Sequence, residues 1–339
     1  MTTAAPIRSL DQVQRYVVPA IASLLDRLDG RTRRVAGYQL GLWDADGRPT
    51  SDRGTGIRPA LALLSARAAD GAVEVGVPAA VAVELAYHFS LLHDGVAGTD
   101  TERPHRPAAW AVFGQPTAVL AGDALLTLAE EVVASAPGGG VAAARLRSDI
   151  RRLIAGQAAE LAFTRQDEVD LTECLQMVAD KTAALMSCAC SLGAMLCGGA
   201  PARVAGLSRF GNRLGMACQL VDDLLGIWGD HRRTGKPVHA DLRARRKTLP
   251  VVWAMGSGTP AGRRVVELYR NPELNDQQAA LTASLIEQTG ARQWTRERAE
   301  QELAAALSEL DQLDLPDELA TELTALAALR VDLDPLPRS

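Results

Sequence analysis

Apolar residues recur at spacings of three and four positions along most of this 339-residue chain. The first such run passes through Val13, Val17, Ile21 and Leu28, as expected for the buried face of an amphipathic helix. No convincing pair of alternating strands is present, so the pattern predicts an all-α protein. The further predicted helices lie at about residues 58–70, 78–97, 116–135, 141–164, 171–199, 203–229, 247–256, 261–269, 276–288 and 292–312.

Short polar breaks, most of them containing glycine or proline, separate these helices. They fall at residues 44–56, 98–107, 136–140 and 229–241. None has the character of a domain linker, because each is short and the helical pattern resumes at once. We therefore expect one domain over residues 1–339, with its core at about 10–330 and a terminal helix within 313–336 packed on the body.

The composition is that of a globular protein with a large core, since 47% of the residues are hydrophobic and 23% are charged. The formal net charge of -5 argues against a nucleic-acid partner, which normally needs a basic surface. The five cysteines lie in apolar segments without metal-type spacing, which favours reduced thiols. Residues 1–14 also lack the pattern of a signal peptide. A cytoplasmic protein is the prediction.

One segment has the length and the lack of charge of a membrane span. Residues 182–202 give 21 consecutive positions without a charge, close to the length that a bilayer requires. Small and polar residues such as Ser187, Ser191, Gly193 and Pro201 dilute its hydrophobicity. We therefore expect a buried core helix and no membrane span.

An acidic cluster lies in an otherwise apolar predicted helix, where Asp222 and Asp223 are followed by Asp230. A separation of seven and eight residues is two helical turns, so the three carboxylates are expected to converge. Adjacent carboxylates repel one another unless a cation lies between them. Mg²⁺ shared with a phosphate ligand is the natural candidate. The alternative is a solvated face on which Asp222 or Asp223 pairs with Arg213 or Arg232.

A second acidic segment, residues 93–100, ends another apolar helix and is followed by Arg103. Charged and turn-forming residues at such a helix end can hold a phosphate group, with arginine making bidentate contacts. Lys181, Lys236 and the basic run 245–247 add positive charges. Basic residues beside two acidic helix ends suit a diphosphate, although a basic run is more commonly a solvated face.

Several separated motifs, in order along the chain, carry a family resemblance over about residues 10–330. They are residues 56–61, 84–94, 101–103, 120–126, 156–157, 181–185, 219–230 and 234–237. With these motifs the chain resembles the trans-isoprenyl diphosphate synthases, or polyprenyl synthetase family. The resemblance implies an antiparallel bundle of the isoprenoid synthase type around a central cavity, usually in a homodimer.

The resemblance also implies a reaction. Two Asp-rich motifs face each other at the cavity mouth and bind about three Mg²⁺ ions with an allylic prenyl diphosphate. Ionisation gives a carbocation, which the double bond of isopentenyl diphosphate then attacks. The implied catalytic residues are Asp222, Lys181 and Arg103; the implied diphosphate-binding residues are Arg58, Arg103, Lys181, Gln219, Lys236 and Lys247; the implied metal ligands are Asp94, Asp100, Asp222, Asp223 and Asp230.

The first Asp-rich motif departs from the family pattern. Gly95 and Gly98 stand where the family has the second and third aspartates of Asp-Asp-x-x-Asp. Asp94 remains, and Asp100 lies at the last position of the longer variant of this motif. Phe89, beside Ser90, stands where the family often places a bulky cavity floor that limits chain length. The alternative for Phe89 is an ordinary core residue.

The isopentenyl diphosphate site departs as well. The family's lysine is replaced by Thr55, its neighbouring arginine by Gly56, and the second of two paired arginines by Pro104; Arg58, Arg103 and Arg106 remain. Losing these charged hydrogen bonds would weaken the site by about 3 to 9 kcal/mol, or roughly two to six powers of ten in affinity.

The allylic side is thus kept while the isopentenyl side is altered. This favours a terpene-synthase-like enzyme, which expels diphosphate and steers the cation to a cyclised, deprotonated or water-quenched product in a dry cavity. One alternative is a chain-elongating prenyltransferase of the farnesyl or geranylgeranyl diphosphate synthase type. Another is a non-catalytic regulatory subunit in a heterodimer with an active homologue, because lost metal carboxylates weaken catalysis.

Overall fold

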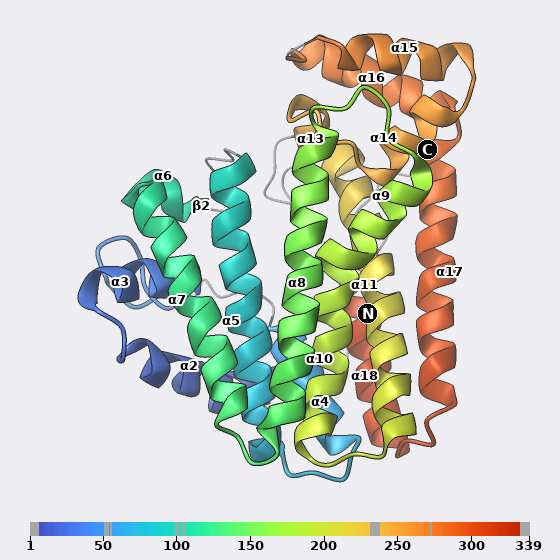
Figure 1. Cartoon of the computed structure of the whole chain (residues 1–339). Helices are drawn as coiled ribbons and strands as arrows, with labels where there is room; N and C mark the ends of the chain where they lie inside the picture. Colours follow the sequence, from blue (N-terminus) through green and yellow to red (C-terminus); the bar gives the residue numbers. More distant parts are fainter. Residues whose placement is uncertain are drawn as a thin grey trace, which may run out of the picture.

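The computed structural model describes residues 7–50, 54, 56–98, 102–103, 106–230, 238–271 and 273–332. Long antiparallel helices form a bundle, as Figure 1 shows, and this confirms the all-α prediction. The bundle contains α4 (Ile57–Arg67), α5 (Val73–Gly98), α7 (Gln115–Ala134), α8 (Gly139–Phe163), α10 (Ala184–Leu196), α11 (Pro201–Trp228), α17 (Ala291–Asp311) and α18 (Asp317–Arg330).

Shorter elements surround these helices. A turn of π-helix, η2 (Ala179–Ala183), joins α9 (Leu171–Val178) to α10, so the predicted helix 171–199 is continuous but widened at its middle. The remaining elements are α1 (Arg8–Gln12), η1 (Val13–Val17), α2 (Val18–Leu25), α3 (Gly30–Gln39), β1 (Glu102–Arg103), β2 (Arg106–Pro107), α6 (Ala109–Phe113), α13 (Ala240–Arg243), α14 (Leu249–Gly256), α15 (Pro260–Tyr269) and α16 (Asp276–Gln288).

Helices α3, α6 and α13 and the strand pair β1–β2 were not predicted. Helix α3 was not expected because its first turns are polar, yet the Asp29 side chain caps it by accepting from the backbone N–H groups of Arg31 and Thr32 at 2.9 and 3.2 Å. Strands β1 and β2 pair antiparallel, with Arg103 opposite Arg106. Each strand has only 2 residues, which is too short for alternation to reveal it.

Helix α10 lies at the centre of the core and confirms the expectation for residues 182–202. Every residue of α10 except Met195 is buried. Close packing depends on small residues, since a Cβ atom on Gly193 would lie 2.1 Å from the carbonyl oxygen of Ala62 in α4. Another helix, Val73–Ala97 within α5, is long and apolar enough to cross a membrane, with a mean hydropathy of 1.5. It packs against α4, α7 and α10, and 67% of its most apolar window is buried, as in a core helix.

The direction of the helices brings distant charged residues together. Helices α5, α8 and α11 all end at the upper end of the bundle in Figure 1, where η2 leads into the descending α10. Asp94, Glu160 and Asp222 lie in the last turns of α5, α8 and α11, and Lys181 lies in η2. One end of the bundle therefore holds residues from four segments that are far apart in the sequence.

Candidate active site

Lys181 is the cation between two carboxylates of different helices. Its Nζ atom lies 3.6 Å from Asp94 Oδ1 of α5 and donates a hydrogen bond to Glu160 Oε2 of α8. Only 19% of the Lys181 side chain is exposed. Burial alone would lower the pKa of Lys181, but Glu160 and Asp94 outweigh burial and raise it. Lys181 is therefore held in its charged form.

Close backbone packing places Lys181 there. Gly156 lies one turn before Glu160 on α8, and a Cβ atom at Gly156 would lie only 2.3 Å from the backbone nitrogen of Lys181. The absence of a side chain lets α8 approach η2 to backbone contact. Glu160 was missed by the sequence analysis, although its position one helical turn from the 156–157 motif is a usable signal.

Asp223 is buried and bound to its neighbours. It is 3% exposed, and its carboxylate accepts hydrogen bonds from Gln219 Nε2 at 2.7 Å and from the backbone N–H of Leu249 at 3.0 Å. Gln219 in turn accepts from Thr182 Oγ1 at 2.7 Å. Burial raises the pKa of Asp223 to about 7. Asp223 and Gln219 thus form a network inside the protein, which joins α11 to α14 and η2.

Asp222 points to a different neighbour. Its Oδ1 and Oδ2 atoms accept hydrogen bonds from the two terminal nitrogens of Arg330, at 3.1 and 2.6 Å. Arg330 is the last residue of α18. This bidentate ion pair was not predicted, and the suggested partner Arg213 pairs instead with Glu302 at 3.0 Å. Consecutive helix positions face about 100° apart, which is why Asp222 and Asp223 reach different elements.

The expected convergence of the three aspartates is wrong for the described structure. Helix α11 ends at Trp228, so Asp230 lies beyond the helix and not two turns along it. Within the described part of the chain, no three His, Cys, Asp or Glu side chains form a group that could hold a metal ion. Asp94 is beside Lys181, and Asp222 already binds Arg330. In this arrangement, the carboxylates do not fit a Mg²⁺ ion.

Asp241 is a further carboxylate near this end of the bundle that the sequence analysis missed. It is 6% exposed, and a Cβ atom on Gly226 would lie 1.8 Å from its Oδ2 atom. Arg246 lies 3.4 Å from its Oδ1 atom. The glycine four residues after Asp222 is the only local sign of this contact in the sequence.

Arg58 is also close to this region. Its guanidinium carbon lies 3.6 Å from the centroid of the Tyr87 ring, which is a short cation–π contact. Its Nε atom is buried without a hydrogen-bond partner. Arg106, another arginine expected on the isopentenyl side, donates to the carbonyl oxygens of Tyr38 and Gln39 at 2.6 and 2.9 Å. Arg106 therefore ties β2 to α3.

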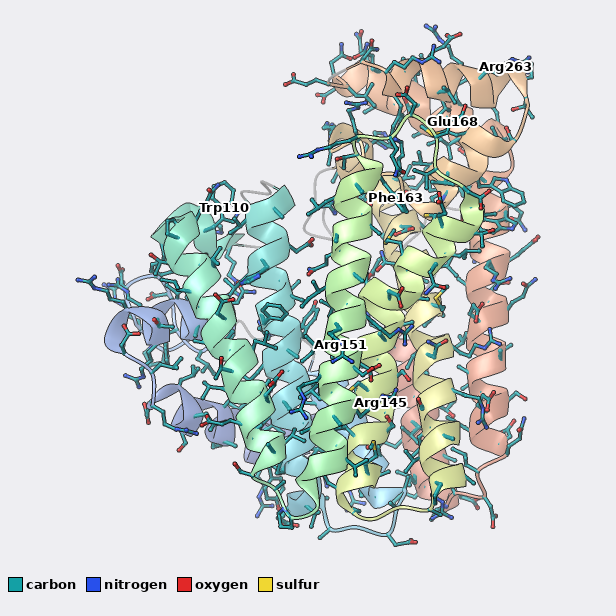
Figure 2. The ribbon with its side chains drawn as sticks, viewed as in Figure 1. Trp110, Arg145, Arg151, Phe163, Glu168 and Arg263 are labelled. Atoms are coloured by element: carbon teal, nitrogen blue, oxygen red, sulfur yellow. The ribbon has the colours of Figure 1, made fainter. Side chains whose placement is uncertain are left out.

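Lys247 binds backbone carbonyl groups. Its Nζ atom donates to the carbonyl oxygens of Phe163, at 2.8 Å, and of Gln166. Phe163 is labelled at the upper end of α8 in Figure 2. Lys247 thus binds the last carbonyl of α8 and one carbonyl just beyond it, and the C-terminal end of a helix favours a cation. The binding of Lys247 to the diphosphate stays a prediction.

Phe89 and Ser90 lie one turn before Asp94 on α5. Phe89 is 3% exposed and its ring meets that of His93 edge-on at 4.7 Å between centroids. Ser90 donates its hydroxyl to the carbonyl oxygen of Tyr87 at 2.7 Å. A cavity of about 30 Å³ lies at η1, α2, α4 and α5, and neither residue lines it. Asp100, Lys236 and the side chain of Arg103 lie outside the described residues.

Asp223 makes the stability of the protein depend on pH. An ordinary aspartate has a pKa of 3.8, and the folded protein raises that of Asp223 to about 7. The folded state therefore keeps a proton that the unfolded chain loses near pH 4, so the free energy of unfolding falls as the pH rises from about 4 to about 7. The fall is at most about 4 kcal/mol.

Urea unfolding of wild type and Asp223→Asn across this pH range tests the expectation. The amide cannot ionise, so the variant lacks this part of the pH dependence and becomes relatively more stable as the pH rises. A constant offset of about 1 kcal/mol is expected, because the amide nitrogen cannot accept from Leu249 N–H. Parallel curves for the two proteins would contradict the raised pKa.

Comparisons with known proteins agree with the fold and the motifs. The polyprenyl synthetase family model matches residues 48–286. A (2E,6E)-farnesyl diphosphate synthase from Mycobacterium tuberculosis is 42% identical over 330 residues, which cover 95% of this chain and 92% of that protein.

Two solved structures are also similar. A polyprenyl synthetase from Streptomyces coelicolor A3(2) has a TM-score of 0.89 and 42% identity, over 96% of this chain and 99% of that one. A geranylgeranyl pyrophosphate synthase from Corynebacterium glutamicum, in complex with isoprenyl diphosphate and magnesium, has a TM-score of 0.77 and 26% identity, over 96% and 97% of the two chains. This chain therefore belongs to the polyprenyl synthetase family and is an enzyme of the isoprenyl diphosphate synthase type.

Proposed function

We propose that this protein is a chain-elongating prenyltransferase, which joins an allylic prenyl diphosphate to isopentenyl diphosphate. The sequence analysis placed a terpene-synthase-like reaction first. The farnesyl and geranylgeranyl diphosphate synthases to which the chain is similar favour the prenyltransferase alternative. The observation that carries the proposal is the buried Lys181, held charged beside Asp94 at the same end of the bundle as Asp222 and Gln219.

In the proposed reaction, a positively charged side chain of the protein stabilises the diphosphate as it leaves the allylic substrate. The bond between the allylic carbon and the diphosphate oxygen breaks, and the electron pair leaves with the diphosphate. The Lys181 ammonium stabilises the negative charge that develops on the departing group. The double bond of isopentenyl diphosphate then attacks the allylic cation, and the adduct loses a proton to the released diphosphate, which restores a double bond. Magnesium belongs to the proposal, but no step is assigned to it, because the carboxylates are already paired.

The protein supplies two further conditions. The apolar residues around α10 and the upper half of α5 keep water from the cation, which would otherwise be quenched to an alcohol. Phe89, buried five residues before Asp94, supports a short or medium prenyl product. We also propose that the protein works as a homodimer, with a heterodimer as the alternative.

Product analysis separates the proposed function from its rivals. Purified protein is incubated with Mg²⁺ and geranyl or farnesyl diphosphate, first without and then with isopentenyl diphosphate. We expect longer prenyl diphosphates only when isopentenyl diphosphate is added, and their loss in Asp222→Ala. Hydrocarbons or alcohols formed without isopentenyl diphosphate would instead identify a terpene-synthase-like enzyme. No turnover under either condition would identify a non-catalytic subunit.

A further inference from the structure

The C-terminal helix places a fixed positive charge on an aspartate of the second motif. Arg330 binds both carboxylate oxygens of Asp222, and it comes from 108 residues further along the chain. The two side chains are 25% and 39% exposed. The ion pair with Asp222 raises the pKa of Arg330, in spite of its burial. Arg330 is therefore a permanent cation in this position.

Other contacts of α18 hold Arg330 in place. Glu322, which is 8% exposed, lies 3.1 Å from Arg67 of α4 and also accepts from the backbone N–H of Ser9. Glu318 forms an ion pair with Arg8. Helix α18 is thus anchored through two turns of its length, and Arg330 at its end is positioned by the packing of the whole helix.

This ion pair and a metal ion need the same atoms. Mg²⁺ binds oxygen ligands at about 2.0–2.1 Å with strict octahedral geometry. The Arg330 nitrogens already lie against both oxygens of Asp222, and a guanidinium a few ångströms away repels a divalent cation. Asp222 can bind Arg330 in this way or bind a metal ion directly, but the described geometry does not allow both.

We propose that Arg330 is a built-in competitor of Mg²⁺ for Asp222, so that the C-terminal helix sets the metal requirement of the enzyme. The inference rests on the proposed function, in which a magnesium diphosphate is the ligand at this site. When the metal takes Asp222, the end of α18 loses its contact with α11. Because the metal and Arg330 exclude one another from Asp222, a change that weakens the contact between Arg330 and Asp222 strengthens metal binding.

The test measures metal binding and not turnover. The melting temperature is followed while Mg²⁺ is added in the presence of inorganic diphosphate, and the Mg²⁺ concentration that gives half of the maximal rise is the readout. Arg330→Gln removes the positive charge and leaves a polar side chain. We expect it to lower this Mg²⁺ concentration about tenfold or more. Asp222→Asn in the Arg330→Gln background should abolish the gain.

Arg67→Gln is the matched control, since it removes another ion pair of α18 without touching Asp222. It should leave the Mg²⁺ midpoint within about twofold of wild type, because α18 remains anchored by Arg8 and Ser9. An unchanged or higher midpoint in Arg330→Gln would overturn the proposal, as would an equal decrease in both variants. Because no prenyl substrate is used, this result is independent of the product assay. A failed product assay with a positive Mg²⁺ result would reject the proposed reaction and keep the competition.

Discussion

Replacing Lys181 with methionine is expected to lower kcat/KM about 100- to 1,000-fold in the prenyl transfer assay. Lys181 lies beside Asp94, and most of its side chain is buried. A preorganised charge in a partly dry site accelerates loss of a charged leaving group by about 100- to 1,000-fold. The substitution also leaves Asp94 and Glu160 facing one another without a cation. Some loss of stability is therefore expected in addition, because a broken ion pair leaves uncompensated charge.

Arg152→Ala is the control for this experiment. Arg152 also lies on α8, and its Nε atom lies 2.7 Å from Asp180 of η2, so it joins the same two elements as Lys181 and Glu160. We expect this variant to lower the melting temperature and to keep kcat/KM within a few-fold of wild type. Equal losses of kcat/KM in the two variants would mean that Lys181 only holds η2 in place.

The second large effect is expected from one added methyl group, in Gly156→Ala. The new Cβ atom would lie 2.3 Å from the nitrogen and 2.7 Å from the Cα atom of Lys181. Both are backbone atoms, so the clash is relieved only when α8 and η2 move apart. Overpacking of this kind costs about 1–3 kcal/mol, or roughly 1 to 4 °C in melting temperature for a chain of this size. A shift of Lys181 by about 1 Å would also cost about 100-fold in turnover.

Gly140→Ala separates this clash from the general effect of alanine in α8. Gly140 lies near the start of the same helix, and a Cβ atom there meets nothing within 4 Å. Alanine is the better helix former by up to about 1 kcal/mol, so this variant should be as stable as wild type or more stable. Thermal melts and kcat/KM of both variants check the prediction. If Gly156→Ala had the same melting temperature and kcat/KM as Gly140→Ala, α8 and η2 would have enough space between them for the added methyl group, and the prediction would be wrong.

These two predictions concern one short contact. Gly156 permits the approach of α8 to η2, and this approach sets the distance from Lys181 to Glu160 and Asp94. The other side of the site is built differently, from Asp222 with Arg330 and from Asp223 with Gln219. The side of the site that holds Lys181 therefore depends on a backbone contact. The side that holds Asp222 and Asp223 depends on ion pairs and hydrogen bonds that a ligand can exchange.

The sequence by itself determined the helices and the residues from which the site is drawn. Helices form through hydrogen bonds between residues four apart, and their apolar periodicity is visible in any short window. For this reason helices such as 276–288 were predicted with their observed bounds. The motifs around Asp94, Lys181 and Asp222 could likewise be selected from their residue types.

Only the tertiary structure decided which of these side chains meet. Local spacing suggested that Asp222, Asp223 and Asp230 share a face, but α11 ends at Trp228, before Asp230. Asp222 binds α18, whereas Asp223 binds α14. The pairing of Asp222 with Arg330 depends on how a helix 108 residues away packs against the bundle. No window of the sequence contains that information, because such a contact follows from the packing of whole helices and not from the residues beside it.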